Sequence, residues 1–322
     1  MKIAAKSPAI TIVLHHPLAD SYAQLIGERF PSVRAIVATD PDQLDRCIGE
    51  ADALLASHFP VHVLDKAKKL RWFQSTAAGI DSLLPIRDKV GHITVTNTRG
   101  IHGQIIADFV MAGLTMLQWD FRRFLRAQAE RKWIPRYIAP LAEKTLGVVG
   151  LGSIGKTIAL RAKSAGMTVI GSKRDISVPV EGVDRLFGSD ALEEMLPRCD
   201  FVVLALPSTQ DTQGLIGAAE LARMQPHAFL INIARGNVVV EAELIKALQT
   251  GAIAGAMLDV FEQEPLPDDS LLWDMPNVIT TPHVAGSPSD FSERMFSILG
   301  GNIERFLDGR PLNNIVDVRR GY

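Results

Sequence analysis

The sequence has few cysteines, no long hydrophobic run and no excess of charge of one sign. Two cysteines occur among 322 residues, Cys47 and Cys199, and neither has a second cysteine or a histidine at metal-ligand spacing. We therefore expect buried thiols in a reducing compartment and no metal site. No stretch reaches the length of a membrane-spanning helix, and 34 Lys and Arg against 36 Asp and Glu leave no basic field for nucleic acid or an anionic membrane. These absences predict a soluble cytoplasmic protein without nucleic-acid or membrane partners.

What the chain does contain is a regular alternation of strand and helix patterns, over a length that suits two domains. Helices are predicted between the strands, for example at residues 40–48, 241–249 and 292–307. The alternation is typical of the α/β class with doubly wound parallel sheets. Short apolar segments predict the strands at residues 9–14, 33–37, 53–56, 71–74, 93–96, 145–149, 167–170, 201–206, 228–233, 253–258 and 278–281.

One long helix is predicted from Gly103 to about Arg131. Its length suits a bridge between domains, and its apolar surplus suits a subunit interface, although a helix of the core explains the same pattern. The apolar stripe consists of Ile106, Phe109, Val110, Gly113, Leu117, Phe121 and Phe124.

A glycine-rich turn follows the strand at residues 145–149. Gly150, Gly152 and Gly155 have the G-x-G-x-x-G spacing, and a helix opens at Ser153 and Ile154. The first glycine of such a motif makes the tight turn, the second lets the backbone approach a pyrophosphate, and the third allows close packing of helix on strand. Because the motif lies between a strand and a helix, it predicts a dinucleotide-binding turn.

Three charged residues follow the last three predicted strands. Arg235 presents a planar fork of donors suited to a carboxylate. Glu264 and His283 follow the next two strands, and a carboxylate beside an imidazole fixes its tautomer and stabilises its protonated form. Since the carboxyl ends of parallel strands meet at one edge of a sheet, these residues form a candidate catalytic constellation.

The segment after the strand at residues 71–74 is rich in small residues. Ala77 to Gly79 would bring bare backbone N–H groups to the carboxyl end of that strand, where open α/β sheets bind ligands. An ordinary turn from strand to helix explains the same residues, so spacing alone leaves both interpretations open.

The motifs, taken in their order, resemble those of the D-isomer-specific 2-hydroxyacid dehydrogenases, which include glyoxylate and hydroxypyruvate reductases. GIHGQIIADFV near residue 100 and the closing GRPLNNIVDVRRGY are similar to the bacterial glyoxylate/hydroxypyruvate reductase branch. The motifs that carry the family resemblance are GLGSIG at 150–155, LPSTQDT at 206–212, INIARG at 231–236, LDVFEQEP at 258–265 and TPHVAG at 281–286.

The resemblance implies an architecture. A Rossmann dinucleotide-binding domain, residues 103–287, would be inserted into a flavodoxin-like substrate domain formed by residues 1–102 and 288–322. The helix after residue 102 would lie in a homodimer interface.

The resemblance also implies a set of site residues. Arg235, Glu264 and His283 would be catalytic, and Ala78 and Gly79 would hold the substrate carboxylate through backbone N–H groups. Asp259 would lie beside the nicotinamide amide. The other residues expected at the cofactor are Gly150, Gly152, Ser153, Ile154, Gly155, Leu206, Pro207, Thr212, Ile233, Ala234 and Gly286.

The second predicted strand of the dinucleotide domain ends in basic residues. An enzyme that uses NAD(H) would have an acidic residue there for the ribose 2′-hydroxyl, but this chain has Ser172, Lys173 and Arg174, with Lys173 at the acidic position. Two cations and a hydroxyl suit a 2′-phosphate, so we expect NADP(H) to be preferred over NAD(H). A solvated basic turn without cofactor preference is the alternative.

The predicted function is NADPH-dependent reduction of a small 2-keto acid, of the glyoxylate or hydroxypyruvate kind, with His283 as proton donor. His58 and Phe59 are candidates for the substrate pocket, and Trp133 is a candidate to enter the site of a neighbouring subunit. Two alternatives remain open at this point: a formate- or phosphite-type dehydrogenase on the same fold, and a non-catalytic, dinucleotide-binding corepressor.

Overall fold

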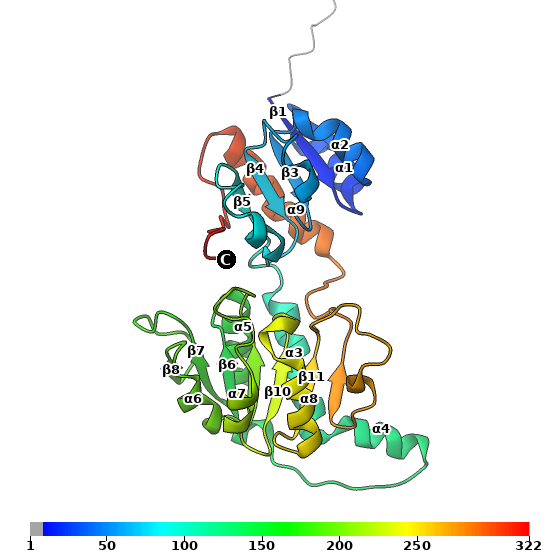
Figure 1. Ribbon diagram of the computed structural model, residues 1–322, viewed down its shortest axis with the longest axis vertical. Coiled ribbons are helices and arrows are strands. Elements are labelled where there is room, and N and C mark those ends of the chain that lie inside the picture. The colour runs from blue at the N-terminus through cyan, green and yellow to red at the C-terminus, as the bar shows by residue number, and fades with distance from the viewer. Residues whose placement is uncertain (1–8, 322) are drawn as a thin grey trace, which may run out of the picture. The chain divides into compact units, whose positions relative to one another are not determined.

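A computed structural model describes residues 9–321, which form two compact units (Figure 1). The first unit comprises the chain up to Ile101 together with the segment from Pro288 onward, and the second comprises His102–Ser287. Each unit is built around one parallel sheet. The predicted α/β class with two doubly wound sheets is therefore confirmed.

The sheet of the first unit has the order β2-β1-β3-β4-β5, and all its pairs are parallel. This order is the flavodoxin-like one, in which the chain reverses direction across the sheet at β1 and β3. The five strands are β1 (Ile10–His15), β2 (Val33–Val37), β3 (Ala53–Ala56), β4 (Trp72–Ser75) and β5 (Thr94–Thr96).

Helices cover both faces of this sheet. Tyr22 of α1 and Met295 of α9 pack on one face, and Leu44 of α2 packs on the other. Helix α2 begins as the sequence predicts, because the Asp40 side chain accepts a hydrogen bond from the Gln43 N–H at 2.8 Å. The helices are α1 (Ala19–Arg29), α2 (Pro41–Cys47) and α9 (Phe291–Leu307), with 3-10 turns at Ile48–Glu50, Val61–Val63 and Asp81–Ile86.

The sheet of the second unit has the order β12-β11-β10-β9-β6-β7-β8, again with parallel pairs throughout. The chain starts in the middle at β6, builds outward to β8 and then returns to build the other half, as in dinucleotide-binding sheets. The strands are β6 (Thr145–Val149), β7 (Thr168–Ser172), β8 (Arg185–Phe187), β9 (Phe201–Leu204), β10 (Phe229–Asn232), β11 (Gly255–Leu258) and β12 (Val278–Thr280).

Two hydrophobic layers sandwich this sheet, because alternate strand residues point to opposite faces. Val202 and Leu204 of β9 face the layer under α7 and α8, whereas Phe201 and Val203 face α3 and α5. The helices are α3 (Gly103–Trp119), α4 (Phe121–Ala129), α5 (Ser153–Ser164), α6 (Leu192–Met195), α7 (Ala218–Arg223) and α8 (Glu241–Thr250), with 3-10 turns at Leu141–Glu143, Leu196–Arg198, Gly236–Val238 and Leu271–Trp273.

The prediction of one helix from Gly103 to about Arg131 is wrong. The predicted helix is interrupted at Asp120, whose φ of 54° lies in the left-handed region. Its side chain caps α4 by accepting from the Arg123 N–H and forms an ion pair with Arg136 at 2.9 Å. Only the α3 part of the predicted stripe is core: Ile106, Val110, Gly113 and Leu117 are buried, whereas Phe121 is exposed.

Different segments lie at the amino ends and at the carboxyl ends of the strands in the second sheet. Helix α4 lies at one end of the unit, and the segment after it runs back along the amino ends of the strands toward β6 (Figure 1). Within residues 9–321, no helix is both long enough and apolar enough to cross a membrane, and no cluster of three or more His, Cys, Asp or Glu side chains could hold a metal ion. The carboxyl ends of the strands carry the loops with the predicted site residues.

Candidate functional site

The ends of β10, β11 and β12 are level at the carboxyl edge of the second sheet. The three strands are neighbours, with Asn232 paired with Leu258 and Leu258 paired with Thr280. Arg235 and His283 each follow the end of a strand by three residues, and Glu264 follows β11 by six. The parallel register therefore brings the loops of the three predicted catalytic residues to one edge.

Glu264 and His283 are in direct contact. His283 Nδ1 and Glu264 Oε2 are 2.8 Å apart, and both side chains remain partly exposed. An ionised carboxylate can only accept, so Nδ1 donates and Nε2 is the ring nitrogen left for another partner. Glu264 Oε1 accepts the Phe261 N–H at 3.1 Å, which fixes the carboxylate relative to its own loop. The predicted pairing of these two side chains is confirmed.

The His283 loop is held by a buried carboxylate. Asp259 is 2% exposed, and its Oδ1 accepts from Thr281 Oγ1 at 2.7 Å and from the Val284 N–H at 2.9 Å. Its Oδ2 accepts from the Ala285 N–H at 3.0 Å. His283 itself has a φ of 53°, a conformation that needs support from its surroundings. Asp259, predicted beside the nicotinamide, thus positions the loop that carries His283.

Arg235 projects from a turn that packs against the Glu264 loop. The Asn232 side chain donates to the Arg235 carbonyl and accepts the Ala234 N–H, both at 3.0 Å. A Cβ atom on Gly236 would lie 1.8 Å from the Phe261 carbonyl carbon, so only glycine permits this approach of the two loops. The Arg235 side chain is half-buried, and its Nη1 donates to the Ala234 carbonyl at 2.7 Å.

The glycine turn between β6 and α5 has the shape that a pyrophosphate requires. Gly150 has a φ of 97°, and a Cβ atom there would lie 2.6 Å from the Ala205 carbonyl oxygen. A Cβ atom on Gly155 would lie 2.0 Å from the Gly150 carbonyl oxygen. A Cβ atom on Gly152 would instead point into open space at the N-terminus of α5, beside Ser153 and Ile154. A ligand phosphate would fit this open space and meet the free N–H groups of the helix.

The end of β7 differs in detail from the predicted cationic cluster. Ser172 is the last residue of β7 and is buried, so Lys173 and Arg174 are the accessible basic side chains. Lys173 Nζ donates to the Val178 carbonyl at 3.1 Å, and Arg174 forms an ion pair with Asp211 at 3.4 Å. Asp175 also lies in this turn.

The remaining predicted cofactor residues follow neighbouring strands. Leu206 and Pro207 follow β9, where Thr212 Oγ1 closes the loop by donating to the Pro207 carbonyl at 2.6 Å. Ile233 and Ala234 follow β10 directly. Gly286 lies after β12, with its carbonyl oxygen 3.0 Å from His102 Nδ1. All of them lie at the carboxyl edge of the sheet.

The predicted substrate residues of the first unit lie at the carboxyl edge of its own sheet. Ala78 and Gly79 follow β4, and the Ala78 carbonyl accepts from the Asn97 side chain at 2.7 Å. His58 follows β3 and is exposed. Phe59 does not belong with it: this side chain is 3% exposed and packs edge to face on Phe73, so it is part of the core.

Three supporting residues were not predicted from the sequence. Asn232 and Thr281 are the second residue of INIARG and the first of TPHVAG, and both anchor loops through side-chain hydrogen bonds. A polar residue at the end of an otherwise apolar strand is the signal that could have identified them. Asp211 could not be found in this way, because its contact with Arg174 joins loops 37 residues apart.

Comparison with known proteins gives consistent matches. The sequence profile described as "D-isomer specific 2-hydroxyacid dehydrogenase, NAD binding domain" matches residues 111–285. The glyoxylate reductase of Korarchaeum cryptofilum is 36% identical over 276 residues, covering 82% of this chain and 81% of the relative.

Solved structures are similar over nearly the whole chain. An NADPH-dependent glyoxylate/hydroxypyruvate reductase from Sinorhizobium meliloti, in complex with NADP and sulfate, has a TM-score of 0.88 at 29% identity, covering 97% of this chain and 100% of that one. A D-isomer specific 2-hydroxyacid dehydrogenase from Xanthobacter autotrophicus, in complex with NADPH and MES, has a TM-score of 0.87 at 34% identity, covering 97% and 99%.

The role of Asp259 in positioning the His283 loop is testable by Asp259→Asn. One carboxylate oxygen becomes an NH2 group, so at least one of the three donors in the loop loses its acceptor. We expect the free energy of unfolding in urea to fall by about 1–3 kcal/mol, with faster amide exchange at Val284 and Ala285. The control is Asp269→Asn, which changes an exposed acid. Unchanged stability and unchanged exchange at these two amides would contradict the assignment.

Proposed function

Because the chain belongs to the D-isomer specific 2-hydroxyacid dehydrogenase family, and is thus an NAD(P)-dependent oxidoreductase, we propose that it reduces a small 2-keto acid to the D-2-hydroxy acid with NADPH. The observation that carries the proposal is the 2.8 Å hydrogen bond between Glu264 and His283, at the edge of the sheet where the glycine turn also lies. Carbonyl reduction requires a proton donor beside the dinucleotide site, and an imidazole oriented by a carboxylate can supply it.

Each of the three residues has a separate task in the proposed reaction. Arg235 binds the carboxylate of the keto acid through two parallel N–H donors. When bound, the nicotinamide supplies the hydride for the carbonyl carbon. His283 donates the Nε2 proton to the carbonyl oxygen as it becomes an alkoxide, and Glu264 orients and stabilises the imidazolium through Nδ1. Ala78 and Gly79 keep their predicted role as backbone donors to the substrate carboxylate.

A preference for NADP(H) over NAD(H) is part of the proposal. Lys173 occupies the position at which an acidic residue would bind a ribose 2′-hydroxyl, and Arg174 adds a guanidinium suited to a phosphate. The similar proteins from Sinorhizobium meliloti and Xanthobacter autotrophicus are complexes with NADP and NADPH. The predicted cytoplasmic location accords with the use of a soluble dinucleotide and stays a prediction.

Glyoxylate and hydroxypyruvate are the proposed substrates because the relatives carry those names. Both are short keto acids whose carboxylate would meet Arg235. None of the pocket candidates distinguishes between the two substrates.

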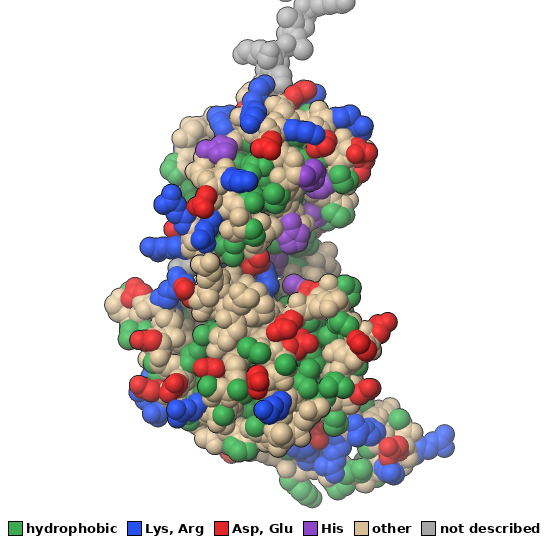
Figure 2. Space-filling view, in the orientation of Figure 1, with side chains coloured by type: hydrophobic (Ala, Val, Ile, Leu, Met, Phe, Trp, Pro, Cys, Tyr) green, Lys and Arg blue, Asp and Glu red, His purple; other side chains and the backbone are tan. Residues whose placement is uncertain are grey.

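We also propose that the protein is a homodimer through α4 and the segment that follows it. Residues 119–140 contain six Lys or Arg against two Asp or Glu, whereas the whole chain carries a net charge of −2. The same segment exposes Leu125 at 58% and both Trp133 and Tyr137 at 96%. Figure 2 shows Lys and Arg side chains gathered around α4. A basic segment with large exposed apolar groups, on a chain that is acidic elsewhere, fits a second copy of this chain.

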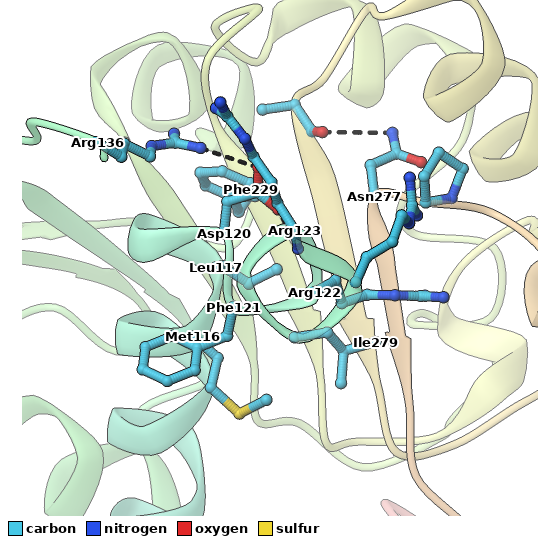
Figure 3. Close-up of a pocket in the computed structure, with 13 residues that line it drawn as sticks. Met116, Leu117, Asp120, Phe121, Arg122, Arg123, Arg136, Phe229, Asn277 and Ile279 are labelled. Atoms are coloured by element: carbon cyan, nitrogen blue, oxygen red, sulfur yellow. Dashed lines mark hydrogen bonds and ion pairs between the residues drawn. The ribbon is translucent and has the colours of Figure 1, made fainter. Parts of the chain in front are cut away.

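A cavity beside α4 gives this face a shape into which a partner could pack. Its volume is about 390 Å³, and it lies against the amino ends of β10, β11 and β12. Arg136 and Asp120, which form an ion pair, and Phe229 are among the residues that line it (Figure 3). Trp133, two residues before a proline in the same segment, remains a candidate to enter the partner's site.

The proposed reaction is tested by a panel of 2-keto acids with NADPH. Oxidation of NADPH should be followed at 340 nm with glyoxylate, hydroxypyruvate, pyruvate and 2-ketobutyrate. We expect glyoxylate or hydroxypyruvate to give the highest kcat/KM, with a D-2-hydroxy acid as product. Turnover of formate or phosphite with NADP+, or tight NADPH binding without turnover of any keto acid, would overturn the proposal.

Glu264→Gln should slow reduction of the keto acid. The amide carries no charge, so the imidazolium that donates the proton loses the carboxylate that orients and stabilises it through Nδ1. We expect kcat/KM for the keto acid to fall by about tenfold or more. Glu262→Gln is the matched control, because Glu262 lies in the same loop and contacts Glu241 instead of His283. An unchanged kcat/KM for Glu264→Gln would remove Glu264 from the mechanism.

The homodimer is tested by sedimentation velocity on Phe121→Glu/Leu125→Glu. Both side chains are exposed in α4, so the folded subunit should tolerate the change while a dimer interface should not. We expect the double variant to sediment as a monomer at micromolar concentration. Leu271→Glu, which changes an exposed leucine elsewhere on the same unit, should remain dimeric. A dimer in all three proteins, or a monomeric wild type, would rule out this interface.

A further inference from the structure

Two loops of opposite charge meet at the end of β7. The loop after β7 carries Lys173 and Arg174, and the loop after β9 carries Asp211. Arg174 Nη2 and Asp211 Oδ2 are 3.4 Å apart. The Asp211 side chain is 81% exposed and the Arg174 side chain 50%, so both groups are accessible to a ligand.

The two cations of this turn are balanced by two acids. Asp175 accepts from the Ser177 hydroxyl at 2.6 Å and from the Ser177 N–H at 2.9 Å. These hydrogen bonds lower the pKa of Asp175 below its usual value, so it is ionised at neutral pH. With Asp211, the turn has a formal charge of zero. A ribose 2′-phosphate, with a charge close to −2 at neutral pH, would meet anions as well as cations here.

The two acids differ in what they do for the fold. Asp175 is bound to its own turn through Ser177, so its removal would change the loop. The loop with Asp211 is shaped instead by Thr212, which donates to the Pro207 carbonyl and accepts the Thr209 N–H at 2.8 Å. The Asp211 carboxylate can therefore be changed without removing the hydrogen bonds that shape its loop.

We propose that Asp211 is a cofactor-selectivity residue whose carboxylate competes with the ribose 2′-phosphate for the Arg174 guanidinium and so weakens NADP(H) binding relative to NAD(H). The inference rests on the proposed NADP(H) site at Lys173 and Arg174. The 2′-hydroxyl of NAD(H) is neutral and neither displaces Asp211 nor is repelled by it. Asp211 thereby limits the preference for NADP(H) that the basic turn creates.

The test measures binding of the adenosine half of each cofactor by calorimetry, which is independent of hydride transfer. The probes are 2′,5′-ADP, which carries the 2′-phosphate, and 5′-AMP, which lacks it. In Asp211→Asn, we expect the affinity for 2′,5′-ADP to rise about three- to tenfold and the affinity for 5′-AMP to stay within about twofold. The ratio of kcat/KM for NADPH to that for NADH should rise by the same factor as the affinity for 2′,5′-ADP.

Two further variants separate the inference from the function on which it rests. Asp308→Asn removes an exposed acid that is paired with Arg310 in the other unit, and should change neither affinity. Arg174→Ala should lower the affinity for 2′,5′-ADP, and adding Asp211→Asn to it should no longer raise that affinity.

The three variants distinguish failure of the role of Asp211 from failure of the proposed phosphate site. An unchanged or lower affinity of Asp211→Asn for 2′,5′-ADP, with the expected loss in Arg174→Ala, overturns the role of Asp211 and leaves the proposed NADP(H) site intact. A gain that persists in the Arg174→Ala background overturns competition for Arg174. Unchanged binding of 2′,5′-ADP to Arg174→Ala overturns both the inference and the proposed phosphate site.

Discussion

Parallel pairing of β10, β11 and β12 in a level register is the constraint on which the candidate site depends. Residues 232, 258 and 280 are paired across the three strands, so the loops that follow start from the same edge. The loops then hold one another: Gly236 lets the Arg235 turn touch Phe261, Phe261 binds Glu264, and Glu264 binds His283. A shift of one strand by a single residue would separate a chain of contacts that spans 49 positions in sequence.

The buried carboxylate of Asp259 stabilises the loop that carries His283, the last residue in this series of contacts. Asp259 lies at the end of β11 and takes three hydrogen bonds from the loop after β12. A buried carboxylate is costly unless its oxygens are bonded, and here the donors come from the segment that carries His283. The cost of burying Asp259 and the left-handed backbone of His283 are thus offset by one set of contacts. The same arrangement leaves the imidazole exposed, where a substrate can reach it.

The carboxyl ends and the amino ends of the strands in the second sheet carry different features. The carboxyl edge bears the glycine turn and the charged loops, whereas the amino edge bears α4, the basic segment after it and the cavity of about 390 Å³. The proposed dimer surface and the proposed chemistry therefore lie at opposite ends of the strands.

Much of the fold could be predicted from the sequence, because its strands are short apolar runs separated by clear helix patterns. The predicted limits of β2, β3 and β6 match the observed ones, and the pairing of Glu264 with His283 followed from the position of each after a strand. The interruption of the helix at Asp120 could not be predicted from periodicity, because the apolar stripe continues through Phe121 and Phe124. The backbone takes a positive φ at the single residue Asp120 between α3 and α4, and the hydrophobic pattern carries no sign of it.

Other features depend on contacts between distant segments. Strand β8 has three residues and only Phe187 fully buried, so its pattern is too short to be recognised. The basic residues Lys173 and Arg174 could be read from the sequence, but burial of Ser172 and the approach of Asp211 are set by the tertiary structure.

The proposed role of His283, held by Glu264, as the proton donor is tested most directly by the kcat of His283→Asn with NADPH and glyoxylate or hydroxypyruvate. Asparagine can still donate a hydrogen bond but cannot give up a proton at neutral pH. The expected result is a loss of about 10²–10⁴ in kcat, with the dissociation constant for NADPH, measured by fluorescence titration, within about twofold of wild type. A variant that retains kcat within tenfold of wild type while binding NADPH normally would contradict the claim.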